Sequence, residues 1–244
     1  MMRSLLAALM CVSVSSVAGA AAPVPVNRAL VPISELAFEV NSRVAELEKL
    51  MISEEAFEEK KGEEVRQAFG VLACMGQAIA EHEDAGTVKI QGAALRDAAL
   101  LFTKKSNFAE AEAALTALKL AQTGASEAAA EKEHPWNKLI NMHPLMEEMN
   151  GRNAKIIRSL RRLRGTDEEA GNASVLVILA LAMQADTHEV KDPTDLPKWN
   201  EWSIAYRDQM HKAAEAIRAK DAKSAREWLD KANLNCDACH EVFQ

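Results

Sequence analysis

RNAKIIRSLRRL, residues 152–163, is the stretch that decides the fold class. Its apolar residues recur three and four positions apart, so they lie on one face of a helix. LEKLMISEEAF, residues 47–57, has the same spacing. No stretch alternates apolar and polar residues in the way a half-buried strand does. Ala, Leu, Glu, Lys and Arg, which favour helices, dominate the chain. The sequence therefore predicts an all-α protein.

Runs of proline, glycine and polar residues divide the chain into eight predicted helices, in two sets of four. The expected helices cover residues 34–55, 63–83, 90–105 and 107–122, then 136–164, 173–187, 198–219 and 222–241. Asn107 and Asp221 are the expected N-caps of the fourth and eighth helices. We therefore predict two antiparallel four-helix bundles in tandem, one over residues 34–125 and one over residues 136–244.

The two sets resemble each other weakly, which favours a duplication. LRD at 95–97 matches YRD at 206–208, and residues 106–126 align with residues 220–240. In this alignment the residues opposite Cys236, Cys239 and His240 are Gln122, Ala125 and Ser126. The N-terminal set thus has the same order of helices as the C-terminal set but lacks its cysteines and histidine. Coincidence remains the alternative, because any two amphipathic helices align about this well.

The first residues have the pattern of a secretory signal peptide. Arg3 precedes an apolar run over residues 4–17, and Ala18-Gly19-Ala20 fits a cleavage site. Cleavage is expected after Ala20 or Ala22, so we interpret residues 1–22 as the signal peptide and expect a periplasmic protein. The run is too short to span a membrane comfortably, and no later segment is long enough to do so. An uncleaved N-terminal anchor remains the alternative.

The net charge excludes one class of partner. The formal charge of −7 becomes −8 when Arg3 is removed with the signal peptide. A nucleic-acid-binding protein needs a basic face, so no nucleic-acid partner is expected. The mature chain keeps Cys74, Cys236 and Cys239. Cys74 lies in the apolar stretch VLACMG and is predicted to be a buried thiol of the core.

CDACH, residues 236–240, has the spacing of a covalent haem-attachment motif. Two thiols three residues apart on a helix lie on one face, where they can reach the two vinyl groups of one porphyrin. His240 follows Cys236 by four residues, so its imidazole lies on the same face and can bind the iron. The sequence therefore predicts one covalent haem c, held by Cys236 and Cys239, with His240 as an axial ligand.

These cysteines have three alternative uses. A redox-active CxxC normally opens a helix after a strand, whereas this motif ends a helix. A structural zinc site needs four ligands, and the other five histidines are scattered singly. A disulfide between Cys236 and Cys239 is disfavoured because a helix presents these side chains poorly for that bond.

Residues 136–244 resemble the cytochrome c-prime family, the four-helix-bundle c-type cytochromes with haem on the last helix. The resemblance rests on CDACH near the end of the fourth helix, on the helix plan and on LMEEMNGRNAKIIRSL, residues 145–160. This first helix is also similar to that of the b-type bundle cytochromes, in which a Met-Glu pair carries the distal ligand. The resemblance implies an antiparallel bundle that encloses the haem. The family usually has one bundle per chain, so the N-terminal half departs from its pattern.

The sixth iron ligand decides the function. Met146 is the candidate distal ligand and Met149 is its competitor, while the alternative is that both are core methionines. Arg207 is a candidate contact for a haem propionate, with a surface salt bridge as the alternative. Methionine opposite histidine suits electron transfer. We therefore expect a one-electron carrier with an unidentified redox protein as its partner.

Two further functions remain as alternatives. A five-coordinate haem would instead bind NO or CO. A peroxidase would need a polar distal pocket, and the sequence offers no His-Arg arrangement near Met146, so no enzymatic activity is expected. The family resemblance also makes a homodimer an option.

Overall fold

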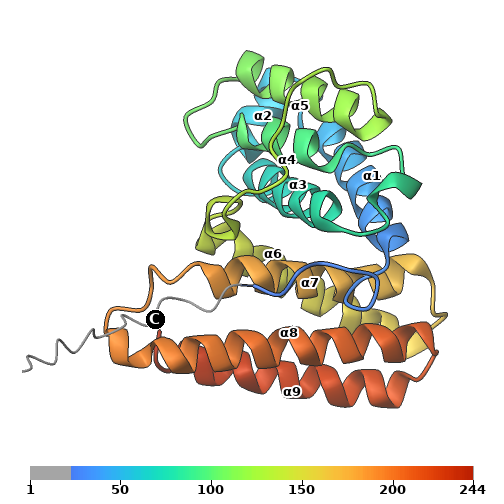
Figure 1. Cartoon of the computed structure of the whole chain (residues 1–244), viewed down its shortest axis with the longest axis vertical. Helices are drawn as coiled ribbons and strands as arrows, with labels where there is room; N and C mark the ends of the chain where they lie inside the picture. Colours follow the sequence, from blue (N-terminus) through green and yellow to red (C-terminus); the bar gives the residue numbers. More distant parts are fainter. Residues whose placement is uncertain (1–22, 244) are drawn as a thin grey trace, which may run out of the picture.

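A computed structural model of the protein describes residues 23–243. Within this range the chain is all-helical and has no strand, which confirms the predicted class (Figure 1). The predicted signal peptide lies outside the described residues. None of the described helices is long and apolar enough to cross a membrane. The α-helices are α1 (Ile33–Leu50), α2 (Glu54–Lys60), α3 (Glu64–Glu81), α4 (Gly92–Leu100), α5 (Phe108–Thr123), α6 (Met142–Ser159), α7 (Asp167–Ala185), α8 (Leu196–Arg218) and α9 (Ala222–His240).

Capping residues decide where several helices begin. Asn107 caps α5 and Asp221 caps α9, as predicted. The predicted helix at 34–55 is wrong at its end, because α1 stops at Leu50 and Ser53 caps the separate helix α2. The Ser53 side chain accepts a hydrogen bond from the Ala56 backbone N–H at 3.2 Å. This contact satisfies a first-turn donor and outweighs the continuous apolar spacing of the segment.

The predicted start of α7 is also wrong. The expected helix began at 173, but α7 begins at Asp167. Thr166 and Glu169 form a capping box, in which each side chain bonds the other residue's backbone N–H. The polar run GTDEEAGN looked like a break between helices, yet it contains the T-x-x-E signature of a helix start.

The N-terminal helices pack around α3. Helices α1 and α4 lie against it, and α5 packs on α4 and α1. α3 and α4 approach so closely that a Cβ on Gly76 would lie 2.5 Å from the Arg96 backbone nitrogen. A Cβ on Gly92 would lie 2.4 Å from the Ala80 nitrogen. Only glycine at these two positions lets the two helix backbones touch.

The C-terminal helices pack around α7. Residues 173–184 of α7 are all buried, as expected of a helix that is apolar on every side. Helices α6 and α8 lie against it, and α9 packs along α8. Figure 1 shows α6, α7, α8 and α9 alternating in direction. Unlike the other neighbouring pairs, α6 and α9 meet only sparsely.

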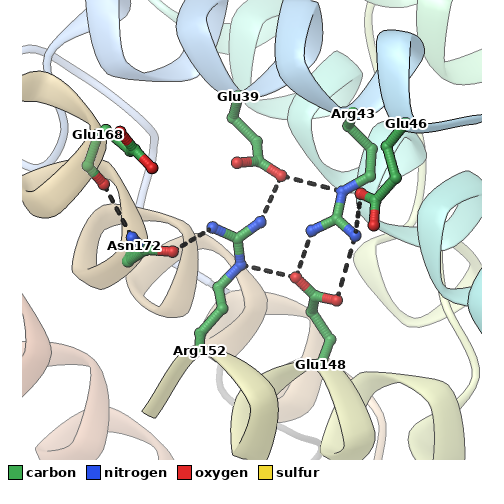
Figure 2. Close-up of polar contacts among 7 residues, drawn as sticks. All are labelled: Glu39, Arg43, Glu46, Glu148, Arg152, Glu168 and Asn172. Carbon is green, nitrogen blue, oxygen red and sulfur yellow. Dashed lines mark hydrogen bonds and ion pairs between the residues drawn. The ribbon is translucent and has the colours of Figure 1, made fainter. Parts of the chain in front are cut away.

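The two groups of helices share one continuous hydrophobic core. Helix α1 packs on α7, and α3 packs on α6. Between α1 and α6 lies a buried ionic network, which Figure 2 shows. Its members are Glu39 and Arg43 of α1 and Glu148 and Arg152 of α6, with exposed fractions of 3% to 7%. The network joins residues more than a hundred positions apart in the chain.

The four buried members of the network are arranged symmetrically between α1 and α6, while outside them Arg43 also pairs with Glu46 and Arg152 bonds Asn172 of α7. Glu39 pairs with Arg152, and Glu148 pairs with Arg43 at 2.5 Å. Each glutamate also pairs with the arginine one turn later on its own helix, at 3.1 Å in α1 and 2.7 Å in α6. Both helices are 18 residues long. The glutamate of each helix therefore pairs with the arginine of the other, which is the reciprocal pattern of an interface between two like surfaces.

Candidate functional site

The CDACH motif forms the last turn of α9. The helix is regular to His240, and the Glu241 backbone N–H bonds the Asp237 carbonyl at 3.0 Å. Cys236 and Cys239 are free thiols, half-buried and packed against the core. The exposed His240 side chain forms no hydrogen bond or ion pair with any described residue. Two free thiols and a free imidazole are therefore presented together on one helical turn.

The environment of the thiols keeps them protonated. Burial raises the pKa of Cys236 to about 12, and the neighbouring Cys239 and Asp237 add to this effect. Burial alone raises the pKa of Cys239 to about 11. A redox-active CxxC pair needs the opposite shift, because its attacking species is the thiolate. The shifts thus argue against the dithiol alternative.

The zinc alternative finds no ligand set within residues 23–243. No three His, Cys, Asp or Glu side chains gather there in a group that could hold a metal ion. Cys74 is fully buried, as predicted, and lies in α3 of the N-terminal group.

Helix α8 supports the motif from one side. The Asn235 side chain donates to Gln209 Oε1 at 2.5 Å, which sets the register of α9 against α8. Beyond the motif, Phe243 packs edge-on against Trp199 and Trp202, with ring centroids 5.1 and 6.0 Å apart. Tyr206 is buried beside Cys236. Burial raises the pKa of Tyr206 well above its usual value, and the Cys236 sulfur adds a smaller effect in the same direction. The end of the chain is therefore held on an apolar, aromatic surface.

Arg207 of α8 lies level with the motif in this register. Its guanidinium is buried and bonds the exposed Asp208 through Nε at 2.9 Å and Nη2 at 2.6 Å. Its Nη1 makes no hydrogen bond with a described residue. Both interpretations of Arg207 thus keep support, since a salt bridge to Asp208 exists and a donor remains for a further acceptor.

One hydrogen bond sets the register of α6 against α9. The Asn153 side chain of α6 donates to Asn233 Oδ1 of α9 at 2.6 Å. Met146 precedes Asn153 by seven residues, and His240 follows Asn233 by seven. Seven residues are two helical turns, or about 10.5 Å. Because α6 and α9 run in opposite directions, Met146 and His240 lie at the same level, each on the face that carries its asparagine.

Met146 and Met149 differ in surroundings. Met149 is 5% exposed and belongs to the core, whereas Met146 is half-buried at the edge of the core. Met146 also borders a cavity of about 820 Å³ that lies between the two groups of helices. The N-terminal group contributes Phe69 and Phe102 to the walls of this cavity. Of the two methionines, Met146 would therefore lose less packing if its side chain turned away from the core to bind an iron.

The residues around the motif fit a covalently attached haem. The thiols are unpaired and share one helical turn, the imidazole has no competing partner, and a thioether lies level with it on the facing helix. Asn153 Oδ1 is buried and accepts no hydrogen bond from the described part of the chain, which marks the α6–α9 interface as polar and incompletely paired. The sparse contact between these helices is consistent with a group held between them.

The buried network between α1 and α6 was not predicted from the sequence. Glutamate and arginine four residues apart look like a surface pair on one helix. The spacing shared by ELAFEVNSR and PLMEEMNGR, residues 35–43 and 144–152, would have been the only available signal.

The comparisons with known proteins add no family. No protein-family model matches the chain, and neither the curated proteins nor the solved structures gave a match.

Proposed function

We propose that the protein is an exported c-type cytochrome that carries one covalent haem c and transfers one electron. In this proposal Cys236 and Cys239 hold the haem. Each thiol adds across one vinyl group, so that sulfur bonds one carbon and the hydrogen goes to the other. His240 and Met146 are the axial ligands, a pair that favours electron transfer and a raised reduction potential. The observation that carries the proposal is the register set by Asn153 and Asn233.

The haem belongs to the second of two related bundles in this proposal. Helices α6 to α9 form the haem-binding bundle, similar in plan to cytochrome c-prime, and α1 to α5 form a degenerate bundle without haem ligands. The symmetric contact between α1 and α6 supports a duplication. The redox partner is a protein met in the periplasm, and the N-terminal bundle is available as a docking platform for it.

A second candidate function is binding of NO or CO at a five-coordinate haem. The cavity that Met146 lines favours it, because it would give a small molecule access to Met146, although no residue of α9 lines this cavity. In that case Met146 would remain a residue of the cavity wall and would not bind the iron.

Optical spectra distinguish the two functions. The protein is produced in a host competent for haem attachment, and spectra are recorded in the ferric and ferrous states with and without CO. Electron transfer predicts a low-spin ferrous spectrum that CO does not change. A high-spin spectrum that shifts with CO would favour gas binding. Absence of a haem band in such a host would refute both functions.

A further inference from the structure

Five basic side chains gather where α6 ends. They are exposed, and they lie on the last turns of α6, on the 3-10 helix Leu160–Arg162 and on the residues that follow it. We call this cluster the basic tip; its members are Lys155, Arg158, Arg161, Arg162 and Arg164. Only Arg164 has an ion-pair partner, Glu169, at 3.5 Å. The other four form no hydrogen bond or ion pair with a side chain of the described residues, so their charges face solvent.

The surface of the basic tip is hollowed. A cavity of about 710 Å³ is lined by Lys155, Arg158, Arg162 and Arg164, among others. Lys220, in the turn between α8 and α9, lies beside it, because a Cβ on Gly165 would come 2.7 Å from the Lys220 side chain. The acids at the start of α7 offset part of this charge. Glu169 accepts hydrogen bonds from the backbone N–H groups of Arg164 and Thr166, and the exposed Glu168 lines the same cavity. The five cations of the tip and Lys220 still outnumber the three acids Asp167, Glu168 and Glu169, so the tip keeps an excess of positive charge.

This excess opposes the charge of the whole chain, which is −7. An acidic protein is repelled by an anionic surface unless it presents a basic region to that surface. Clusters of four to eight Lys or Arg attract anionic lipid headgroups, and each cation near the surface strengthens binding. Arginine, which supplies four of the five members, also matches phosphate geometry with two parallel hydrogen bonds.

The basic tip lies far from the CDACH motif. Arg158 follows Met146 by twelve residues along α6, which is about 18 Å. Figure 1 shows the turn between α8 and α9 at the opposite end of the bundle from the C-terminus. A redox protein docked on the tip would therefore sit far from the haem of the proposed function. A surface to which the protein is only attached does not need to lie close to the haem.

We propose that the basic tip binds the anionic phospholipid headgroups of a membrane surface and leaves the CDACH end of the bundle pointing away from it. The binding is independent of the proposed function, and only the choice of a membrane over a redox protein uses the position of the haem.

Vesicle co-sedimentation of the haem-loaded mature protein tests this proposal. One set of vesicles contains equal amounts of phosphatidylglycerol and phosphatidylcholine, and the other contains phosphatidylcholine alone. We expect binding to the anionic vesicles only, at about 50 mM salt, and its loss at about 500 mM salt, because salt screens the exposed charges. The same result is expected for protein without haem.

A matched pair of variants locates the surface. The tip variant carries Arg158→Gln, Arg161→Gln and Arg162→Gln, and the control carries Lys89→Gln, Lys104→Gln and Lys105→Gln. The control removes three exposed, unpaired cations of the N-terminal group and so changes the net charge equally. We expect the tip variant to bind anionic vesicles roughly a hundredfold more weakly, and the control to bind like the parent protein. Circular dichroism melting checks that both variants are folded.

Three results would overturn the proposal. The first is a folded parent protein that does not bind anionic vesicles at low salt. The second is an equal loss of binding in the tip variant and the control, which would reveal a nonspecific charge effect. The third is tip-dependent binding of polyglutamate without binding of vesicles, which would assign the tip to an acidic protein.

Discussion

Helices α5 and α9 differ in where they end, and this difference separates the half that carries the proposed haem ligands from the half that lacks them. Aligned at their N-caps, Asn107 and Asp221, the two helices run together until α5 stops at Thr123. Gly124 then turns the chain with a φ of 79°, the left-handed conformation that closes many helices. α9 continues for three residues past the equivalent point, and two of these are Cys239 and His240.

Helices α4 and α8 also differ, at the ends that lie beside the ends of α5 and α9. Aligned on LRD and YRD, α8 begins seven residues earlier than α4. The extra residues include Trp199 and Trp202, which contact Phe243 just past the end of α9. Because α8 and α9 are antiparallel, the early start of one lies beside the late end of the other. The C-terminal half thus has Cys239 and His240 on an extension that the N-terminal half lacks.

The largest expected effect is loss of covalent haem. Cys236→Ala with Cys239→Ala is expected to remove it entirely. Adding Gln122→Cys, Ala125→Cys and Ser126→His to that variant is not expected to restore it, because residues 125 and 126 lie beyond the end of α5. Haem staining after denaturing electrophoresis measures both outcomes. Covalent haem on the grafted variant would mean that residue identity alone, rather than the longer helix, distinguishes the two halves.

The next largest effect concerns the distal ligand, Met146. When Glu39 and Arg43 of α1 are aligned with Glu148 and Arg152 of α6, Ala37 occupies the position of Met146. Met146→Ala is expected to convert a low-spin ferrous spectrum to a high-spin one that binds CO. Met149→Ala is the control. It is expected to lower the free energy of unfolding by about 2–5 kcal/mol, because it opens a cavity in the core, and to leave the spectrum unchanged. A high-spin spectrum in Met149→Ala alone would reassign the distal ligand.

The buried network tests how alike α1 and α6 are. Arg43→Ala and Arg152→Ala are each expected to lower the free energy of unfolding by about 3–5 kcal/mol, since either leaves two buried carboxylates short of positive charge. Equal losses, measured by urea unfolding, would support the symmetry of the contact. Lys119→Ala, which breaks the exposed pair with Glu48, is expected to cost less than about 1 kcal/mol. Clearly unequal losses for Arg43→Ala and Arg152→Ala would contradict the symmetry, and losses no larger than that for Lys119→Ala would show that the network contributes no more than an exposed pair.

Much of the fold could be read from local signals, while the relation between the halves could not. The caps Asn107 and Asp221 and the burial of Cys74 depend on neighbours within a few residues, and they were predicted correctly. The burial of Glu39 and Arg152 depends on side-chain contacts between α1 and α6, and no local pattern predicts them. The CDACH motif can be recognised from the sequence alone, because the spacing of its cysteines and histidine is local. The preference for Met146 over Met149 gains support only from the pair Asn153–Asn233, which joins two helices far apart in sequence.

Acid should weaken the contact between the halves. Burial opposes ionisation of Glu39 and Glu148, but Arg152 and Arg43 outweigh it, so the pKa of each carboxyl lies below its usual value. A lowered pKa in the folded state contributes stability that is fully present above the unfolded value of about 4.3. That contribution is lost as pH falls through the folded pKa values. The free energy of unfolding, followed by circular dichroism in urea, should therefore decrease below about pH 4. Glu148→Gln should flatten this dependence; an unchanged slope would exclude the network as its source.

The smallest effect concerns the two arginines that occupy matching positions in α4 and α8, Arg96 and Arg207. Arg96 is bonded to Gln77 Oε1 at 2.6 Å and to the carbonyls of Glu131 and Lys132 at 2.7 and 3.2 Å. Arg207 has only Asp208 as a side-chain partner among the described residues. Arg96→Gln is therefore expected to cost about 2 kcal/mol of stability, because the buried Gln77 Oε1 loses its donor.

Arg207→Gln should leave stability nearly unchanged and lower the reduction potential, because a positive charge near a haem propionate disfavours the ferric state. Arg96→Gln should leave the potential as it is, since the N-terminal half has no iron nearby in the proposed arrangement. Potentiometric titration of both variants measures this contrast. If both substitutions left the potential unchanged, Arg207 would be a structural arginine like its counterpart, and the two halves would differ only in the extension that carries Cys239 and His240.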